Sequence, residues 1–323
     1  MEVLGSILEI VGNTPIVRLN KIPKDLSSTL LVKMESLNPG GSVKDRVGIS
    51  MLEDAEKKGL LTPGATIIEP TSGNTGMGLA MCAAVKGYKM IFTMPDKMSE
   101  EKRNLLRAFG AEIVITPTAV PHDSPENYIQ VAEKLNKEIP NSFMPNQYTN
   151  PANPEVHYRT TGPEIWRQTD GKVDVFVCGM GTGGTITGVG RYLKEQKKSV
   201  QVVGADPEGS IFYDRFRGRD AEPHTYKVEG IGEDFMPDTL DMSVVDDIVR
   251  VSDKEAFHMA RRLAREEGIL VGGSGGAAVT AALNVAKDRK HGSIVVTLLP
   301  DTGRNYLSRL FSDAWMREQG MLP

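Results

Sequence analysis

The feature that most constrains the fold is a regular alternation of short apolar runs with longer helical patterns. Residues 65–69, 89–94 and 112–116 are apolar runs of strand length, and helical periodicity follows each of them, up to Gly87 and over 99–109 and 127–138. Parallel strands are joined by right-handed crossovers, which are usually helices. The alternation therefore predicts a three-layer α/β/α architecture, in which loops at the carboxyl ends of the strands form the ligand crevice.

The same style continues on both sides of this region. Further strands are expected at 16–19, 30–34, 173–178, 202–205 and 293–299, with helices from Thr185 to about Glu195 and over 254–267. Gly272–Gly276 predicts a tight glycine turn. Residues 207–240 hold few periodic segments, and so long an irregular stretch is usually functional. The stretch 140–154, rich in Pro, Asn and Gln, marks either a lobe boundary or a substrate loop.

Composition excludes several classes of function. A chain of 323 residues can form two lobes, and a net charge of -4 favours neither nucleic acid nor an anionic membrane surface as a partner. Cys82 and Cys178 lie far apart in apolar surroundings, which predicts buried free thiols and no metal site. No stretch reaches the length of a membrane span, and no leader pattern opens the chain. We therefore expect a cytoplasmic protein.

A lysine follows a glycine turn in the stretch Asn38–Arg46. Ser42 and Asp45 have the spacing of a capping box, which places Lys44 in the first turn of a helix. The positive end of the helix dipole favours the neutral amine, which is the nucleophilic form. Lys44 is therefore a candidate for Schiff-base formation with a carbonyl group, and the alternative is a solvated surface lysine.

Two glycine-rich loops follow predicted strands and precede predicted helices. Thr71–Gly76 presents hydroxyls, an amide and backbone N–H groups, which suits a carboxylate or a phosphate. Gly179–Thr185 is a good cradle for a phosphate dianion. It also satisfies the dinucleotide pattern G-x-G-x-x-G, and Asp206 follows where a ribose-binding acid would stand. A dinucleotide-binding oxidoreductase therefore remains an open alternative.

One cofactor accounts for this set of residues. A phosphate-bearing aldehyde needs a lysine for its carbonyl, a cradle for its phosphate, a partner for its ring nitrogen and a separate pocket for the substrate carboxylate. Lys44, the two loops and Thr302 at the end of a predicted strand supply these groups. Pyridoxal phosphate is therefore the cofactor that the pattern favours.

The combined motifs resemble a known family. Gly12–Pro15, Gly41–Arg46, Glu69–Gly76 and Gly181–Thr185 together resemble the fold-type II, tryptophan synthase β-like pyridoxal-phosphate enzymes, in the group that contains cysteine synthase and cystathionine β-synthase. The resemblance covers nearly the whole chain. Asp206–Ile211, Val228–Gly232 and Phe311–Met316 are more similar to the catalytic core of cystathionine β-synthase, whereas Asn38–Pro39 and Gly303 are more similar to cysteine synthases.

The resemblance implies a role for each matching residue. Lys44 is expected to form the internal aldimine and to act as the base at Cα, Asn74 to bind the ring oxygen of the cofactor, and Thr302 to face the pyridine nitrogen. Asp301 is the alternative partner of that nitrogen. The resemblance places the cofactor phosphate at Gly181, Thr182, Gly183, Gly184 and Thr185, the substrate carboxylate at Thr71, Ser72, Thr75 and Gln147, and the bound amino acid beside Gly230 and Ile231.

The reaction that the resemblance implies is a β-replacement of transsulfuration and cysteine biosynthesis. L-Serine, or an O-activated serine, forms an external aldimine and then an aminoacrylate, to which L-homocysteine adds to give L-cystathionine. The alternative is a cysteine synthase that uses O-acetylserine or O-phosphoserine with sulfide. From a further class, a metabolite-sensing binding protein remains open.

The resemblance also implies an organisation. Residues 1–40 and 151–323 are expected to form a larger cofactor-binding lobe, and residues 41–150 a smaller mobile lobe that binds substrate. A homodimer is expected, without heme and without a tandem regulatory domain.

Overall fold

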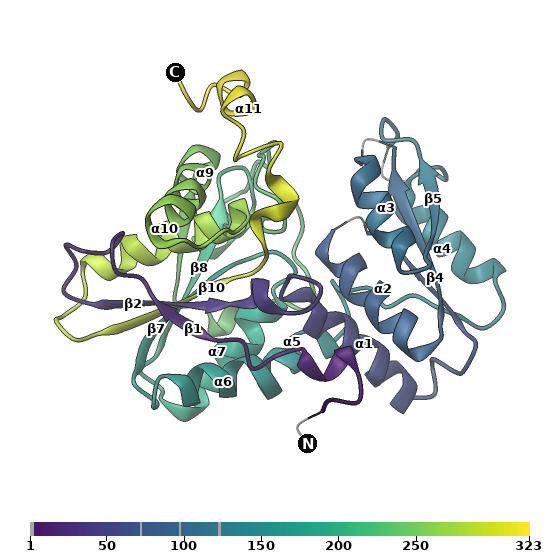
Figure 1. Ribbon diagram of the computed structural model, residues 1–323, viewed down its shortest axis with the longest axis horizontal. Coiled ribbons are helices and arrows are strands. Elements are labelled where there is room, and N and C mark those ends of the chain that lie inside the picture. Colours follow the sequence, from purple (N-terminus) through teal and green to yellow (C-terminus); the bar gives the residue numbers. More distant parts are fainter. Residues whose placement is uncertain (1–2, 72, 97, 122–123) are drawn as a thin grey trace. The chain divides into compact units, whose positions relative to one another are not determined.

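The computed structural model describes residues 3–71, 73–96, 98–121 and 124–323. The chain forms two compact units (Figure 1), of which unit 1 comprises Met1–Val11 with Asn38–Asn153, and unit 2 comprises Gly12–Leu37 with Pro154–Pro323. The boundaries expected from the sequence differ mainly at the start of the chain, since residues 1–11 group with the smaller unit. The roles of the units in binding stay predictions.

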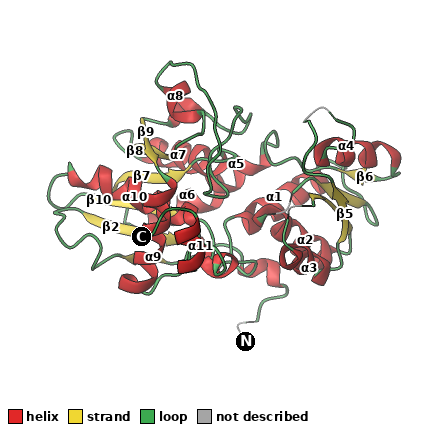
Figure 2. Cartoon of the chain, turned by 90° about the horizontal axis from the view of Figure 1, so that it is seen from above, coloured by secondary structure: helices red, strands yellow, loops and turns green. Residues whose placement is uncertain are grey.

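Unit 1 is built on a parallel sheet of four strands in the order β5-β4-β3-β6. Helix α4 lies on one face of this sheet, and α2 and α3 lie on the other (Figure 2). All four residues of β3 are buried, as is usual for a central parallel strand. The elements of unit 1 are α1(Lys44–Lys57), β3(Thr66–Glu69), α2(Asn74–Lys86), β4(Lys89–Pro95), α3(Glu100–Ala108), β5(Glu112–Thr116), α4(Tyr128–Glu138) and β6(Ser142–Phe143), with a short 3-10 helix at Ile7–Ile10.

Side-chain caps explain where the helices of this unit begin. The Ser99 hydroxyl accepts from the Lys102 N–H before α3, and the Asn127 side chain accepts from the Ile129 N–H before α4. Both caps satisfy N–H groups that a helix leaves without internal partners. The helices predicted over 99–109 and 127–138 are therefore confirmed to within a residue or two at their ends.

Unit 2 is built on a sheet of six strands in the order β1-β2-β10-β7-β8-β9, in which only the β1–β2 pair is antiparallel. Helices α9 and α10 cover one face, and α6 and α7 cover the other (Figure 1). The α/β layering predicted from the sequence is confirmed. The strands are β1(Ile16–Arg18), β2(Thr29–Met34), β7(Val173–Gly179), β8(Gln201–Pro207), β9(Asp247–Val251) and β10(Ile294–Leu299).

The helices that complete unit 2 differ in length and type. Helix α5(Ala152–Val156) begins at the boundary between the units and continues through a π-helical turn, His157–Thr161, into α6. The helix predicted over 254–267 is α9 followed by a second π-helical turn, Leu263–Glu267. The remaining helices are α6(Gly162–Gln168), α7(Gly184–Gln196), α8(Phe212–Phe216), α9(Asp253–Arg262), α10(Gly273–Lys287) and α11(Asp313–Glu318), with 3-10 turns at Glu35–Leu37, Met242–Val244 and Gly303–Tyr306.

The tight turn predicted at Gly272–Gly276 is wrong, because these glycines open helix α10. These glycines lie where α10 packs against α9. A Cβ atom at Gly276 would lie 1.9 Å from the Ala256 carbonyl oxygen of α9, and one at Gly273 would lie 2.6 Å from the Phe257 ring. Glycine therefore allows α10 to approach α9 closely, and the pattern was a signal of helix contact instead of chain reversal.

Candidate functional site

Lys44 is the first residue of helix α1, as the sequence predicts. A turn precedes it, in which the Gly41 N–H donates to the Asn38 carbonyl at 2.8 Å and Gly41 has a positive φ of 82°. Only glycine adopts this conformation at no steric cost. The glycine turn therefore sets the point at which the chain enters the helix, and with it the place of Lys44.

The capping box predicted for Ser42 and Asp45 does not form. The Ser42 hydroxyl accepts from the Lys44 N–H at 3.2 Å, whereas the Asp45 carboxylate accepts from the Gly40 N–H at 2.6 Å. The turn at Gly41 bends the chain so that Gly40, and not Ser42, reaches the Asp45 side chain. Because Asp45 is buried, this contact closes the turn in front of Lys44.

Helices α1 and α2 cross at a pair of glycines. A Cβ atom at Gly78 would lie 2.4 Å from the Lys44 carbonyl oxygen, and one at Gly48 would lie 2.6 Å from the Gly78 carbonyl carbon. Asn74 precedes Gly78 by four residues and so lies on the same face of α2. Asn74, in the first turn of α2, therefore lies on the face of α2 that packs against α1.

The loop Thr71–Gly76 leads from β3 to α2, with Gly73 as the N-cap residue. The Thr75 hydroxyl donates to the Gln147 side-chain oxygen at 2.6 Å, and the Asn153 amide donates to the Gln147 carbonyl at 2.8 Å. Two of the residues expected to hold the substrate carboxylate are thus brought together within unit 1. Ser72 lies outside the described residues.

Glu69 is a functional candidate that sequence reasoning missed. Its buried carboxylate accepts from the Asn146 N–H at 3.1 Å and from the Gln147 N–H. Burial raises the pKa of the Glu69 carboxyl to about 7, although the two backbone hydrogen bonds act in the opposite direction. Glu69 therefore anchors the backbone that carries Gln147. The available signal was an acidic residue at the end of an apolar strand, directly before a glycine loop.

The second glycine loop connects β7 to α7 within unit 2. Gly183 has a φ of 82° and is the N-cap residue of α7, so the first N–H groups of the helix point into the loop. Cβ atoms at Gly179 and Gly181 would lie 2.6 Å from the Ile231 side chain and 2.7 Å from the Gly230 carbonyl oxygen. Gly230 and Ile231, expected beside the bound amino acid, therefore pack directly against this loop.

The irregular segment after β8 supports the same loop. The Gly232 N–H donates to the Met180 carbonyl at 2.5 Å, and the Thr239 hydroxyl donates to the Thr182 carbonyl at 2.5 Å. These bonds hold the Met180 and Thr182 carbonyl groups of the loop on the irregular segment. A phosphate dianion matches such a cradle of backbone donors and threonine hydroxyls, so these residues fit the phosphate of the predicted cofactor.

Thr302 follows β10 and caps a 3-10 turn, since its hydroxyl accepts from the Arg304 N–H at 3.4 Å. The neighbouring Asp301 is buried, and its carboxylate accepts from the Tyr306 hydroxyl at 2.7 Å. The bond from Tyr306 uses one oxygen of the Asp301 carboxylate, so Thr302 and Asp301 both stay predictions as partners of the ring nitrogen.

Asp206 does not serve as an exposed acid. It is fully buried within β8, where its carboxylate accepts from the Tyr213 N–H at 2.9 Å and from the Ser210 hydroxyl. Burial raises the pKa of the Asp206 carboxyl to about 6. The carboxylate therefore accepts from a backbone N–H of α8. Because it is buried, it is not available to bind a ribose, which argues against the dinucleotide interpretation.

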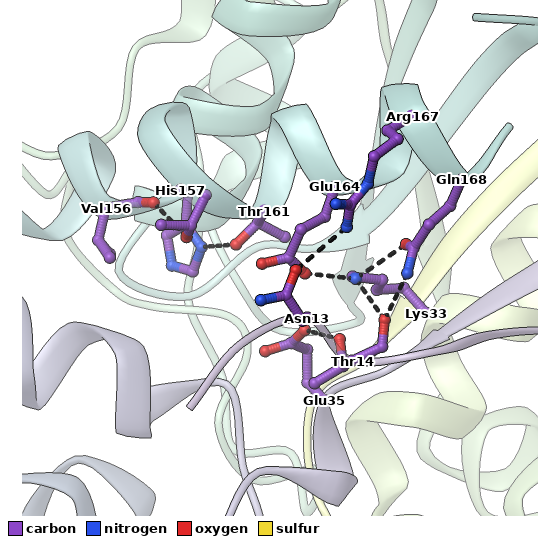
Figure 3. Close-up of polar contacts among 11 residues, drawn as sticks. Asn13, Thr14, Lys33, Glu35, Val156, His157, Thr161, Glu164, Arg167 and Gln168 are labelled. Carbon is purple, nitrogen blue, oxygen red and sulfur yellow. Dashed lines mark hydrogen bonds and ion pairs between the residues drawn. The ribbon is translucent and has the colours of Figure 1, made fainter. Parts of the chain in front are cut away.

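A buried lysine ties three segments of unit 2 together (Figure 3). The Lys33 ammonium group donates to the Thr14 carbonyl at 2.6 Å, to the Glu164 carboxylate at 2.5 Å and to the Gln168 side chain at 3.0 Å. These contacts link the turn before β1, strand β2 and helix α6. Sequence reasoning gave Lys33 no role, because nothing local distinguishes it from a lysine on a solvent-facing strand.

Both cysteines are free and buried, as the sequence predicts. Within the described ranges, no group of three or more His, Cys, Asp or Glu side chains is placed to hold a metal ion. None of the helices in the part of the chain that the structure describes has the length and apolar character needed to cross a membrane.

Comparison with known proteins connects this geometry to a family. The model of the family described as pyridoxal-phosphate dependent enzyme matches residues 7–301. The chain is 52% identical to cystathionine beta-synthase of Apis mellifera and 53% identical to that of Oryctolagus cuniculus, in each case over 99% of this chain, but it spans only 64% and 59% of the lengths of these relatives. A solved structure, an O-acetylserine dependent cystathionine beta-synthase from Helicobacter pylori, superposes with a TM-score of 0.86 at 40% identity, covering 96% of this chain and 99% of that one.

Proposed function

Because this chain belongs to the pyridoxal-phosphate dependent enzyme family and therefore uses that cofactor, we propose that it catalyses β-replacement at L-serine, or at an O-activated serine, with L-homocysteine to give L-cystathionine. The observation that carries this proposal is the identity of 52% and 53% to two cystathionine beta-synthases over 99% of the chain. The catalytic class would be that of a lyase in amino-acid biosynthesis.

The cofactor residues are assigned within each unit. When bound, pyridoxal phosphate supplies an aldehyde for an amine and a conjugated ring that stabilises negative charge at Cα. In unit 1, the Lys44 amine would hold the aldehyde carbon and Asn74 would hydrogen-bond the ring oxygen. In unit 2, Thr302 would bind the pyridine nitrogen, and the phosphate would lie on Gly181, Thr182, Gly183, Gly184 and Thr185.

Lys44 and Thr302 would direct the chemistry. The Lys44 amine, once displaced by the amino group of the substrate, would remove the Cα proton. A neutral Thr302 hydroxyl would not keep the pyridine nitrogen protonated, which would favour loss of the β-substituent over other outcomes.

The substrate carboxylate would lie at the N-terminus of α2. Thr71, Ser72, Thr75 and Gln147 would donate to it, and Gly230 and Ile231 would lie beside the amino acid. The bond between Thr75 and Gln147 supports the shared role of these two residues. When a carboxylate binds there, the Thr75 hydroxyl would donate its hydrogen bond to the carboxylate instead of to the Gln147 side-chain oxygen.

A cysteine synthase reaction is the second candidate. The solved structure with a TM-score of 0.86 is described as O-acetylserine dependent, which favours an O-acetylated donor for this chain as well. Sulfide in place of homocysteine would then give cysteine. We also propose a homodimer, on the basis of the family resemblance, and light scattering of the purified protein would test it. The composition supports a cytoplasmic location as a further proposal.

Reconstitution of the purified protein with pyridoxal phosphate tests the assignment of Lys44. We expect a visible absorption band in the wild type and its loss in Lys44→Ala, because the variant removes the amine proposed to hold the aldehyde. Lys57→Ala, an exposed lysine in the same helix, is the matched control and should keep the band. A band of equal intensity in Lys44→Ala would remove Lys44 from the site.

Product analysis then ranks the substrates. Serine and O-acetylserine are each combined with homocysteine and with sulfide, and cystathionine and cysteine are quantified. Cystathionine formed at the higher kcat/KM supports the first proposal. Absence of cystathionine with both donors, together with cysteine from sulfide, would establish the alternative instead.

A further inference from the structure

A histidine lies at the π-helical turn between α5 and α6. His157 is fully buried, and its ring Nδ1 lies 2.9 Å from the Thr161 hydroxyl (Figure 3). π-Helical turns are rare and occur frequently at functional sites. None of the roles assigned above uses this side chain.

The π-helical turn packs on one face of α7. Thr185, Gly188 and Tyr192 follow each other at helical spacing and lie on the same side of that helix. A Cβ atom at Gly188 would lie 2.1 Å from the Pro154 carbonyl oxygen and 2.7 Å from the His157 Cβ atom. This close approach brings the imidazole to the first turn of α7, where its Nε2 lies 3.2 Å from the Thr185 hydroxyl.

The direction of these bonds depends on the tautomer of the imidazole, and phosphate binding at Thr185 would fix it. A hydroxyl has one proton, and a phosphate dianion is only an acceptor. If the Thr185 hydroxyl donated to His157, it could not also donate to a phosphate. Donation to the phosphate therefore requires a proton on His157 Nε2, and the neutral ring then accepts from the Thr161 hydroxyl at Nδ1.

We propose that His157 is a positioning residue for phosphate binding: it donates from Nε2 to the Thr185 hydroxyl and thereby directs the Thr185 proton into the loop Gly181–Thr185. Thr161 holds the required tautomer from the other side of the ring. This inference rests on the proposed function, because it takes the loop as the phosphate site of the cofactor.

Two matched variants separate the two ring nitrogens. In His157→Asn, the amide lies near the position of Nδ1 and loses the contact with Thr185, whereas in His157→Gln it reaches toward the position of Nε2 and can still donate. We expect the dissociation constant of pyridoxal phosphate to rise about tenfold in His157→Asn and in Thr185→Val, since Thr185→Val loses its hydrogen bond to the phosphate and His157→Asn loses the bond that directs the Thr185 proton toward it. His157→Gln should restore most of the affinity.

The direct readout is the ³¹P resonance of bound pyridoxal phosphate together with its dissociation constant. Both quantities should change in His157→Asn and in Thr185→Val. The double variant His157→Asn/Thr185→Val should bind the cofactor no more weakly than Thr185→Val alone, because the two residues act through one bond. Thr169→Val, which removes a buried hydroxyl that bonds the Ile165 carbonyl at 2.8 Å, is the control and should change neither quantity.

Additive effects in the double variant, or an unchanged resonance and affinity in His157→Asn, would overturn the inference. Should His157→Asn fail to fold, Thr161→Val leaves the ring in place. This variant is expected to weaken cofactor binding, because Thr161 no longer holds the tautomer with the proton on Nε2. Normal cofactor affinity in Thr161→Val would also contradict the inference. An unchanged Thr185→Val would reject both the inference and the phosphate assignment, while reconstitution of Lys44→Ala tests the cofactor proposal separately.

Discussion

At the residue scale, the candidate site depends on polar groups whose partners lie far away in the sequence. Glu69 accepts from the backbone of Asn146 and Gln147, and Gln147 accepts from Thr75. These contacts join the end of β3, the first turn of α2 and the chain after β6 into one cluster. The cluster holds Gln147 in place before any substrate arrives, which lowers the entropy cost of binding.

Glu69→Gln should weaken this cluster. A glutamine has only one acceptor oxygen for the two backbone N–H groups, so we expect the KM for the amino-acid donor to rise several-fold. The affinity for pyridoxal phosphate should be unaffected, because the variant does not touch the residues proposed to hold it. Steady-state kinetics and cofactor titration measure the two effects. Equal losses in both would point to general misfolding.

The same substitution should change how stability depends on pH. The pKa of Glu69 is raised from 4.5 to about 7 in the folded protein, so between these values the folded state binds more protons than the unfolded state. The contribution of Glu69 to the free energy of unfolding therefore falls as pH rises from 4.5 to 7. Urea unfolding across this window should show a flatter pH dependence in Glu69→Gln than in the wild type, and parallel curves would contradict the assignment.

At the element scale, single buried contacts decide how helices and strands are joined. Glycines allow α1 to cross α2 and α10 to pack on α9, whereas in unit 2 the Lys33 ammonium group links β2 to α6. The Lys33 side chain is fully buried and the Glu164 side chain is 8% exposed, so the pair is shielded from solvent. Removing one partner would leave the other charge uncompensated in the interior.

Lys33→Met should therefore destabilise the protein by about 3–5 kcal/mol, the usual cost of breaking a buried ion pair. The matched control is Lys58→Met, which removes the exposed pair with Asp54 and should cost under about 1 kcal/mol. Urea unfolding measures both values. Equal and small losses would mean that the Lys33 network contributes no more than a surface ion pair.

At the scale of the whole molecule, the chain crosses between its two units more than once. Residues 12–37 belong to unit 2, although unit 1 residues precede and follow them in the sequence. Lys44 and the proposed carboxylate residues lie in unit 1, whereas the phosphate loop and Thr302 lie in unit 2. A cofactor that binds only the folded protein would stabilise it against unfolding.

Pyridoxal phosphate should raise the free energy of unfolding with the logarithm of its concentration once that concentration exceeds its dissociation constant. A ligand that binds only the folded state adds about 2.7 kcal/mol at a concentration 100 times its dissociation constant. We expect the thermal midpoint of the cofactor-free protein to rise on reconstitution, and inorganic phosphate at the same concentration to have much less effect. Scanning calorimetry measures the midpoints, and identical values with and without cofactor would contradict the proposal.

The sequence by itself determined the features that depend on local pattern. The alternation of strand and helix patterns predicted parallel sheets, because periodicity is a property of neighbouring residues. The stretch Asn38–Arg46 predicted Lys44 in the first turn of a helix, although the capping box used for that prediction does not form. The tertiary structure decided which polar groups are buried and what they meet. The sequence around Glu69, Asp206 and His157 does not show what these side chains contact, and only packing brings each to its partners. The glycines of α10 show the same limit, since a glycine run signals close approach or chain reversal alike until the neighbouring helix is in place.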